Sequence, residues 1–432
     1  MQKRFINLST YLLYLIPFAI LTGPFLPDLF ISIIGLIFLI ITIINKQWKY
    51  FKNNYFYLFI TFYFYLIFSS INSYFLLDSL EGIFFYFRFA IFALAVWFLI
   101  DEEKKLIRNF TLIFIATFLL ALLDGYYQYF NGQSLFGYTA PGNRLNLLFN
   151  DDRILGGYLS RLFPLLIALV IFSFKVEKYS HLFFFTALFI ATNLLIYLTG
   201  ERTAIGLTIL TFFLFIIFLK KFKKIKIITI TISFMLIIIV SVFDDEIRKR
   251  NIIHTFEQIS GIMYTDGLEL SSKNLVIFSP QHHSMYVTGW RIFLDNPIFG
   301  SGSDTFRYVC SEQKYAYDHR SCNTHPHNTY IQLLSEIGII GVAFVLIIIS
   351  YICRLLFYNL INKLNDTGDY FFFILCGLDD KILSDKITNN ITENNCVSLY
   401  NKKIEEVVPY LCSADMYVGN DSFGSHITSQ SG

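Results

Sequence analysis

Two histidines stand at the start of an apolar stretch late in the chain, in the segment Thr324–Gln332. His325 and His327 follow a long polar region, and the chain from Ile337 onward is apolar. An imidazole with its ordinary pKa near 6.5 can accept a proton at neutral pH. Pro326 favours an extended backbone at His325, so we expect the two rings to point apart and only one to lie in a site. A titratable group at a membrane surface predicts chemistry on a charged, lipid-linked substrate.

The composition places the chain among integral membrane proteins. It is 55% hydrophobic and 15% charged, whereas a soluble domain carries about 25% charged residues. The formal net charge of +2 says little, because in a membrane protein the position of the charges matters more than their sum. We expect membrane lipid and no nucleic acid among the partners.

Apolar runs recur along the chain at lengths close to the about 20 helical residues that cross a bilayer. They are Leu8–Thr22, Leu26–Asn45, Tyr55–Ile71, Ile83–Ile100, Ile107–Leu123, Leu155–Phe174, Leu182–Thr199, Ala204–Leu219, Ile225–Phe243 and Ile337–Phe357. The sequence therefore predicts an all-α polytopic membrane protein with about ten transmembrane helices.

Lysine and arginine fall in alternate loops between these runs. The basic loops begin near Lys3, Lys46, Lys104, Lys175 and Lys220, whereas residues 72–82 carry neither residue type. Because basic loops stay in the cytoplasm, we expect the N- and C-termini to be cytoplasmic. Residues 244–328, called the large loop below, then lie outside, which in a bacterium is the periplasm.

This topology also sorts the cysteines. Cys310 and Cys322 fall in the large loop, where disulfides persist, whereas the other four cysteines lie at or beyond the inner face. We expect a Cys310–Cys322 bridge, with two free thiols as the alternative. The Cys and His spacing does not predict a metal site.

Several arginines fall inside or beside the predicted helices at the outer side of the membrane. They are Arg88, Arg144, Arg153, Arg161 and Arg202. Snorkelling to lipid phosphate is the simple interpretation. Arg202 differs, because the tight turn Thr199–Ala204 holds its guanidinium at a fixed depth, where it can grip a phosphate in a bidentate fork.

The motifs together resemble the O-antigen ligase and polymerase superfamily of bacterial inner-membrane enzymes. The resemblance covers residues 1–360 and rests on the order of its motifs. These are Asn150–Leu159, Thr199–Ala204, Asp295–Gly302, His325–Gln332 and Glu336–Gly341.

The resemblance implies a reaction: transfer of a glycan from undecaprenyl pyrophosphate to a sugar hydroxyl, such as that of lipid A-core, at the periplasmic face without a metal or other cofactor. By position, Arg202 would bind the pyrophosphate and His327 would be the catalytic base. Arg153 or Arg161 would be a second phosphate ligand.

Two features depart from the family pattern. Where the family carries an arginine early in the large loop, this chain has His282. We expect Arg291 or Arg307 to make the phosphate contact of that arginine instead, or His282 itself to serve as a cation. The family also has further helices after the tenth. In this chain we expect residues 361–368 to form a junction between the membrane part and residues 369–432 instead.

Residues 369–432 read as a soluble α/β piece. Strands are expected at Tyr370–Leu375, Cys396–Leu399 and Asp415–Val418, and helices at Asp379–Ile391 and Ile404–Ser413. The alternation predicts a parallel, Rossmann-like sheet.

The run Ala414–His426 resembles the donor loop of heptosyltransferase-type glycosyltransferases of family 9. By position, Asp421, Ser422 and His426 would contact the sugar nucleotide. Because a core rarely suffices below about 70 residues, we expect this truncated GT-B half to be inactive.

Other functions remain open for the membrane part. The same scaffold serves O-antigen polymerases and protein O-oligosaccharyltransferases, which differ in the acceptor. A transporter or flippase of lipid-linked sugars would share the arginines but need no base, and such proteins often show paired helix interruptions. An inactive truncated fusion is the remaining interpretation.

Overall fold

The computed structural model describes residues 2–139, 144–149, 154–174, 179–218, 223–260, 264–265, 268–269, 279–366, 372–374, 381–388 and 396–412. The chain divides into two compact units, Met1–Val342 and Ala343–Gly432. Each unit is described by itself.

Helices account for the apolar runs. They are α1 (Gln2–Leu21), α2 (Phe25–Asn45), α3 (Asn54–Ile71), α4 (Leu76–Phe84), α5 (Phe87–Glu102), α6 (Leu106–Asn131), α7 (Leu155–Ser173), α8 (Tyr179–Leu198), α9 (Arg202–Phe218), α10 (Lys223–Phe243) and α15 (Thr329–Asp366). Within the described residues, 8 helical segments are long and apolar enough to cross a membrane, and two shorter apolar helices lie within α8 and α9. The chain is a multi-pass helical membrane protein, as its composition predicts.

The fourth predicted span is interrupted rather than continuous. The helix breaks between α4 and α5 at Phe85 and Tyr86, where the backbone bonds shorten to the i to i+3 pattern, as in Tyr86 N to Ile83 O at 2.8 Å. The carbonyl of Phe84 instead accepts the Tyr63 hydroxyl at 3.0 Å. A side chain from α3 therefore satisfies a backbone group that the break releases, as the hydrocarbon core requires.

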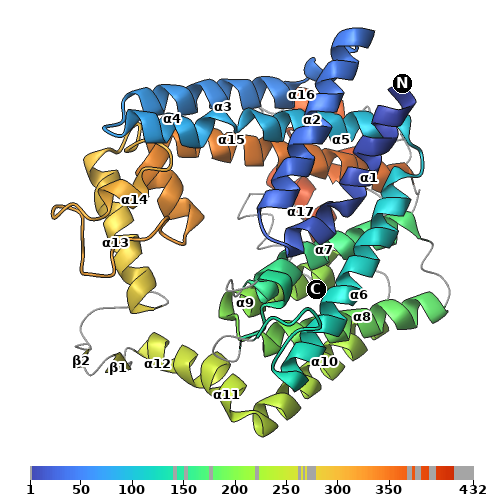
Figure 1. Ribbon diagram of the computed structural model, residues 1–432. Coiled ribbons are helices and arrows are strands. Elements are labelled where there is room, and N and C mark those ends of the chain that lie inside the picture. Colours follow the sequence, from blue (N-terminus) through green and yellow to red (C-terminus); the bar gives the residue numbers. More distant parts are fainter. Residues whose placement is uncertain are drawn as a thin grey trace. The chain divides into compact units, whose positions relative to one another are not determined.

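Two large hydrophobic clusters pack α1, α2 and α5 to α9 of the first unit against one another. Figure 1 shows the course of these helices. One joins α1, α2 and α5 around Phe38 and Phe98, and the other joins α6 to α9 around Phe118, Phe163 and Leu195. Because lipid tails are as apolar as these side chains, the contacts stabilise the bundle through close packing rather than through removal of water. The second cluster is the one that fixes α7 against α8 and α9.

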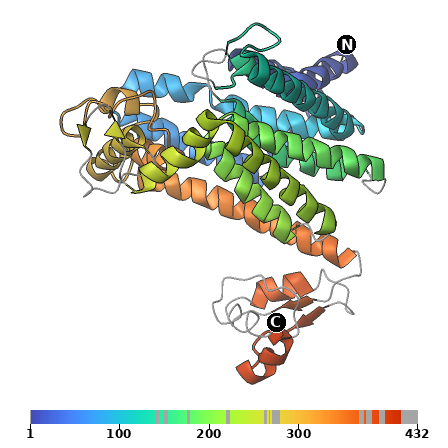
Figure 2. The ribbon, with the colours of Figure 1, turned by 90° about the horizontal axis from the view of Figure 1, so that it is seen from below.

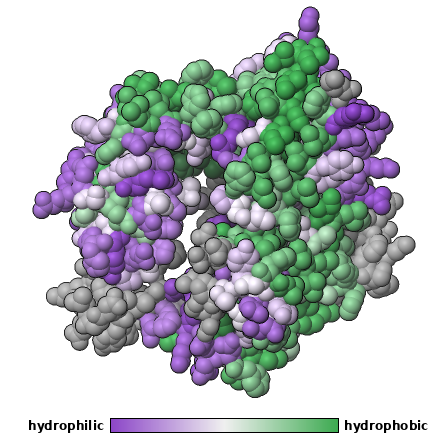
Figure 3. Space-filling view, viewed as in Figure 1, coloured by the Kyte–Doolittle hydropathy of each residue, from purple (hydrophilic) through white to green (hydrophobic). Residues whose placement is uncertain are grey.

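The large loop has a small core of its own. It contains α11 (Asp245–Arg248), η4 (Lys249–Ile253), α12 (His254–Ser260), the strands β1 (Tyr264–Thr265) and β2 (Leu268–Glu269), α13 (Pro280–Asp295) and α14 (Phe306–Val309). Met285, Ile292 and Phe306 are fully buried there. Figure 3 shows hydrophilic surface over α13 and α14, and the face is hollowed between them and the helices α7 and α9.

The loop Pro297–Gly302 inserts into a break in α15. At Gly338 the backbone leaves the helix, with φ 63° and ψ −172°. The amide of Ile339 then donates to Pro297 O at 2.9 Å, and the amide of Gly302 donates to Glu336 O at 2.9 Å. The motifs Asp295–Gly302 and Glu336–Gly341 are therefore bonded to each other.

The second unit holds a short parallel strand pair. β3 (Phe372–Ile374) pairs with β4 (Cys396–Ser398), with Phe373 opposite Val397. The chain between them includes α16 (Lys381–Thr388), and α17 (Ile404–Cys412) follows (Figure 2). Val407 and Leu411 of α17 pack against Leu399. The other expected features of this region, the strand Asp415–Val418 and the donor-loop residues Asp421, Ser422 and His426, lie outside the described residues.

Candidate active site

Three histidines from two segments of the large loop meet at one place. His282 lies in the first turn of α13, and His325 and His327 lie just before α15. The ring centroids of His282 and His327 are 5.7 Å apart, in an edge-on arrangement. The rings of His325 and His327 are closer still, at 4.3 Å. A cluster of titratable rings results.

The expectation that the rings of His325 and His327 point apart is wrong. Pro326 constrains the residue before it, but His327 adopts φ 53°, in the left-handed region. The two rings lie close together and tilted, with an interplanar angle of 51°. The sequence offered no signal for this backbone conformation, because histidine seldom adopts positive φ.

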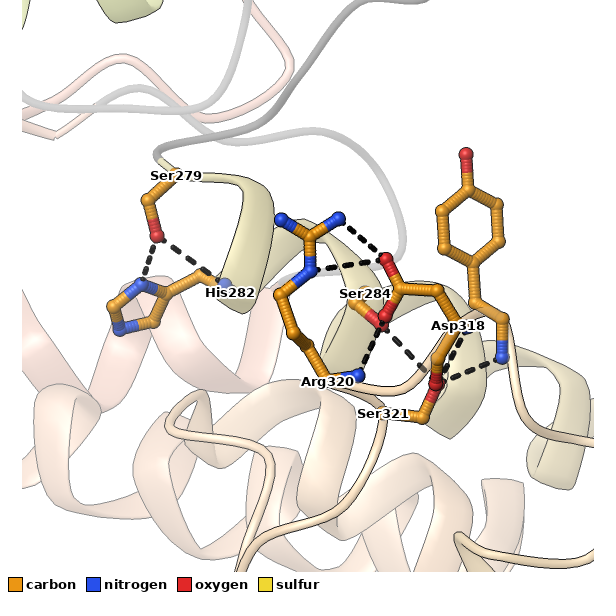
Figure 4. A network of polar contacts seen from close by, with 7 residues as sticks. Ser279, His282, Ser284, Asp318, Arg320 and Ser321 are labelled. Atoms are coloured by element: carbon orange, nitrogen blue, oxygen red, sulfur yellow. Dashed lines mark hydrogen bonds and ion pairs between the residues drawn. The ribbon is translucent and has the colours of Figure 1, made fainter. Parts of the chain in front are cut away.

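Ser279 holds the ring of His282. It caps the N-terminus of α13, accepting the backbone N–H of His282 at Oγ at 3.3 Å. The same oxygen lies 2.6 Å from Nδ1 of the His282 ring, as Figure 4 shows. The cap therefore fixes both the start of the helix and the orientation of the imidazole.

The charge of Arg202, the first residue of α9, affects the pKa of His282 in this cluster. Burial lowers the pKa of His282 below its ordinary value of 6.5, and repulsion from the Arg202 charge lowers it further. His282 is thus influenced by Arg202 and lies beside His327, the two residues that the family resemblance assigns to the reaction. The lowered pKa disfavours the protonated ring of His282, which weighs against its expected role as a cation.

His327 is also held as a neutral base. Nδ2 of Asn323 lies 2.9 Å from Nε2 of His327. An amide nitrogen can only donate, so Nε2 accepts and the ring proton is on Nδ1. Burial lowers the pKa of His327, and the charges that His325 and His282 carry when protonated lower it further.

The turn between α8 and α9 contains a carboxylate that the sequence analysis missed. Glu201 accepts the amides of Gly156 and Gly157, at the N-terminus of α7, at 2.7 and 2.9 Å. Burial raises the pKa of Glu201, against the opposing effects of these two amides and of the charges of Arg144 and Arg161. The pair Gly156-Gly157 at a helix start was the available signal, because adjacent glycines permit a close approach to backbone.

The other predicted phosphate ligands differ in their surroundings. Arg161 folds back toward Glu201, since Nη1 of Arg161 and Oε2 of Glu201 both lie 3.5 Å from the point where a Cβ on Gly157 would stand. Arg291 donates to the carbonyl of Ala316 at 2.8 Å, and Arg307 pairs with Asp304 at 2.6 Å.

The contacts of Arg291 and Arg307 favour a role within the fold of the large loop over the phosphate role expected for them. Arg153 lies outside the described residues. Arg88 is neither at this site nor free to snorkel, because it pairs with both carboxylate oxygens of Asp28 at 2.8 Å.

A polar network and a disulfide stabilise the segment that leads to the histidines. Asp318 accepts from Arg320 and from Ser284 on α13, at 2.6 Å in each case, and Ser321 joins them (Figure 4). Burial alone would raise the pKa of Asp318, but these bonds lower it to about 2. Cys310 is joined to Cys322 in a disulfide, with Cα atoms 5.2 Å apart.

Metal ligands do not gather at this site. Among the residues that the structure describes, no group of three or more His, Cys, Asp or Glu side chains could hold a metal ion.

Comparison with known proteins gives one match. The model of the O-antigen ligase family matches residues 182–346, less than half of the chain. No curated protein and no solved structure matches. The match ends before residues 369–432 and lends no support to their resemblance to glycosyltransferase family 9. It does include Arg202, His282 and His327, and it supports the resemblance of this membrane protein to the O-antigen ligase superfamily.

Proposed function

We propose that the chain transfers a glycan from undecaprenyl pyrophosphate to a sugar hydroxyl at the periplasmic face of the inner membrane. The observation that carries the proposal is that the ring of His282 lies beside that of His327 and is influenced by the charge of Arg202, while burial lowers the pKa of both rings. A fixed cation and a neutral base at one place are what a glycosyl transfer with an anionic leaving group requires.

The bond changes assign a task to each group. The acceptor oxygen forms a bond to the anomeric carbon of the donor glycan as its proton passes to Nε2 of His327. The bond between that carbon and the phosphate oxygen breaks, and undecaprenyl pyrophosphate leaves with the electron pair. Arg202 stabilises the negative charge that develops on the leaving oxygen.

His282 fits the role of a neutral phosphate ligand. If the Ser279 hydroxyl donates to Nδ1, then Nε2–H of His282 is free to donate to a phosphate oxygen beside Arg202. Arg161 remains the proposed second guanidinium at the phosphates, with part of its charge offset by Glu201. Asn323 occupies Nε2 of His327, so the acceptor hydroxyl would replace this amide as it binds.

Glycan transfer in a host that lacks its own ligase tests the assignment. Variants His327→Gln and Arg202→Ala should each lose transfer by about 100-fold or more, the scale expected for a general base or for a charge at the leaving group. His319→Gln, another histidine of the large loop, is the matched control and should transfer normally. Full transfer by His327→Gln would favour a transporter of lipid-linked sugars, which needs no base.

The acceptor is the finer part of the proposal. We propose lipid A-core, with a growing glycan chain (polymerase) or a protein hydroxyl (oligosaccharyltransferase) as the alternatives. Mass analysis of the products from one lysate separates the three, because the glycan then appears on lipid A-core, on itself or on protein. We further propose that residues 369–432 carry no transfer activity of their own, so Asp421→Asn, Ser422→Ala and His426→Gln should leave the products unchanged.

A further inference from the structure

Glu201 anchors the turn that carries Arg202 onto another helix. Its two carboxylate oxygens accept separate backbone amides, those of Gly156 at 2.7 Å and Gly157 at 2.9 Å. These amides belong to the first turn of α7, where no intrahelical acceptor exists for them. A carboxylate in this place also interacts favourably with the positive end of the helix dipole. The contact therefore ties the α8–α9 turn to the start of α7 at two points.

The glycines of α7 are needed for this contact. A Cβ on Gly156 would stand 2.5 Å from Oγ1 of Thr199 and 3.0 Å from Cδ of Glu201. Both distances fall below ordinary van der Waals contact, so any larger residue at position 156 would push the turn away.

The large loop fixes the same turn from its other side. Nε of Arg250, in η4, donates to Gly200 O at 2.9 Å, and Nδ2 of Asn251 donates to Tyr197 O at 3.0 Å. Gly200 has φ 67° and no Cβ, which leaves room for the Arg250 side chain. The residue just before Arg202 is thus held at α7, and the residue before that is held at η4.

We propose that Glu201 is a positioning residue for Arg202. It fixes the backbone from which the Arg202 side chain reaches the pyrophosphate, and it draws the neighbouring charges of Arg144 and Arg161 to itself. This inference rests on the proposed function, since it assigns a partner to the guanidinium that function requires. Glu201 itself touches no reacting atom in this scheme.

A double-mutant cycle tests the proposal. Glu201→Gln replaces one acceptor oxygen by a donor, so one of the two amide bonds is lost and the turn can shift. We expect transfer to slow by at least about fivefold in the otherwise native chain, the scale of coupling between neighbouring residues. In the Arg202→Lys background, whose bidentate fork is already lost, Glu201→Gln should slow transfer by less than about twofold.

Two further variants provide a second probe of the Glu201 contact and a control. Gly156→Ala leaves the carboxylate intact but displaces it, and it should show the same dependence on residue 202. Glu257→Gln, an exposed acid that contacts His254 on its own helix, is the matched control and should transfer normally. The melting temperature in detergent is measured for every variant, so that loss of folded protein is corrected before rates are compared.

The outcomes separate the inference from the proposed function. Equal slowing by Glu201→Gln in both backgrounds, or native transfer by Glu201→Gln alone, would overturn the positioning role. Native transfer by both Arg202→Lys and Arg202→Ala would instead overturn the proposed function. Weaker coupling of Gly156→Ala than of the Glu201 variant would count against the anchoring contact as the cause.

Discussion

The rings of His325 and His327 lie with their centroids 4.3 Å apart, although a proline separates the two residues. The positive φ of His327 produces this approach. A protonated His325 would repel a proton on His327, which is the second cause of the lowered His327 pKa after burial. The pair therefore keeps the proposed base neutral to a lower pH than an isolated histidine would.

Replacing His325 should move the pH dependence of transfer in a defined direction. The His327 pKa lies below 6.5 in the native chain, and transfer falls as pH drops through that pKa because the base becomes protonated. His325→Gln removes a like charge, so the His327 pKa rises and the acid limb of the rate profile moves to higher pH. Rates measured from pH 5 to 8 in both chains check this. If the acid limb of the His325→Gln rate profile stays in place or moves to lower pH, His325 does not lower the His327 pKa.

Gly338 should not tolerate a side chain. Its φ is 63°, and a Cβ there would stand 2.4 Å from the carbonyl oxygen of Ile298. Gly338→Ala should therefore force the Pro297–Gly302 loop out of the break in α15 and lower the melting temperature and the transfer rate together. Gly206→Ala, at a helical glycine with open space around its Cβ, is the control. It should be neutral or slightly stabilising, because alanine favours helix by about 1 kcal/mol.

The disulfide should support the histidine segment. Cys322 directly precedes Asn323, the residue whose amide contacts His327. Cys310→Ser with Cys322→Ser should destabilise the large loop by about 2–4 kcal/mol on the usual scale of native disulfides, and it should slow transfer. Cys353→Ser, at an exposed free thiol, is the control. A double variant with a native melting temperature and native rate would show that the bridge plays no such part.

The Asp318–Arg320 pair should matter more than the similar pair Asp304–Arg307. Asp318 and Arg320 side chains are 21% and 30% exposed, against 39% for both members of the other pair. Asp318→Asn should destabilise the large loop by about 1–3 kcal/mol, and Asp304→Asn by less than about 1 kcal/mol. Limited proteolysis and thermal melts measure both. Equal effects of the two substitutions would contradict the importance of burial.

The pH dependence of stability gives an independent check on the same pair. The pKa of Asp318 is about 2, below its ordinary value of 3.8. A carboxylate with a depressed pKa stabilises the fold above its unfolded pKa and loses that contribution as pH falls toward the folded value. The native loop should therefore lose stability between about pH 4 and pH 2, and Asp318→Asn should lose less over the same range.

The sequence by itself determined the membrane class and most of the helices, and it indicated the residues that we propose as the reactive groups. Hydrophobic runs of membrane length admit few structures other than helices, because the bilayer core offers no partner for backbone groups. Arg202 and His327 stood out because a tight turn and the start of the last apolar run hold them at the membrane face, and because both fall in motifs of the family resemblance. These inferences needed only local composition and spacing.

Only the tertiary structure decided which of these groups meet. The distance between His282 and His327 depends on contacts between α13 and the segment before α15, which local patterns do not encode. Pro326 restricts only His325, so the positive φ of His327 could not be predicted from the proline. The role of Glu201 required the approach of α7 to the α8–α9 turn, a contact between residues more than forty positions apart. Long-range packing fixes such contacts, and a sequence pattern reports only which residues are available to make them.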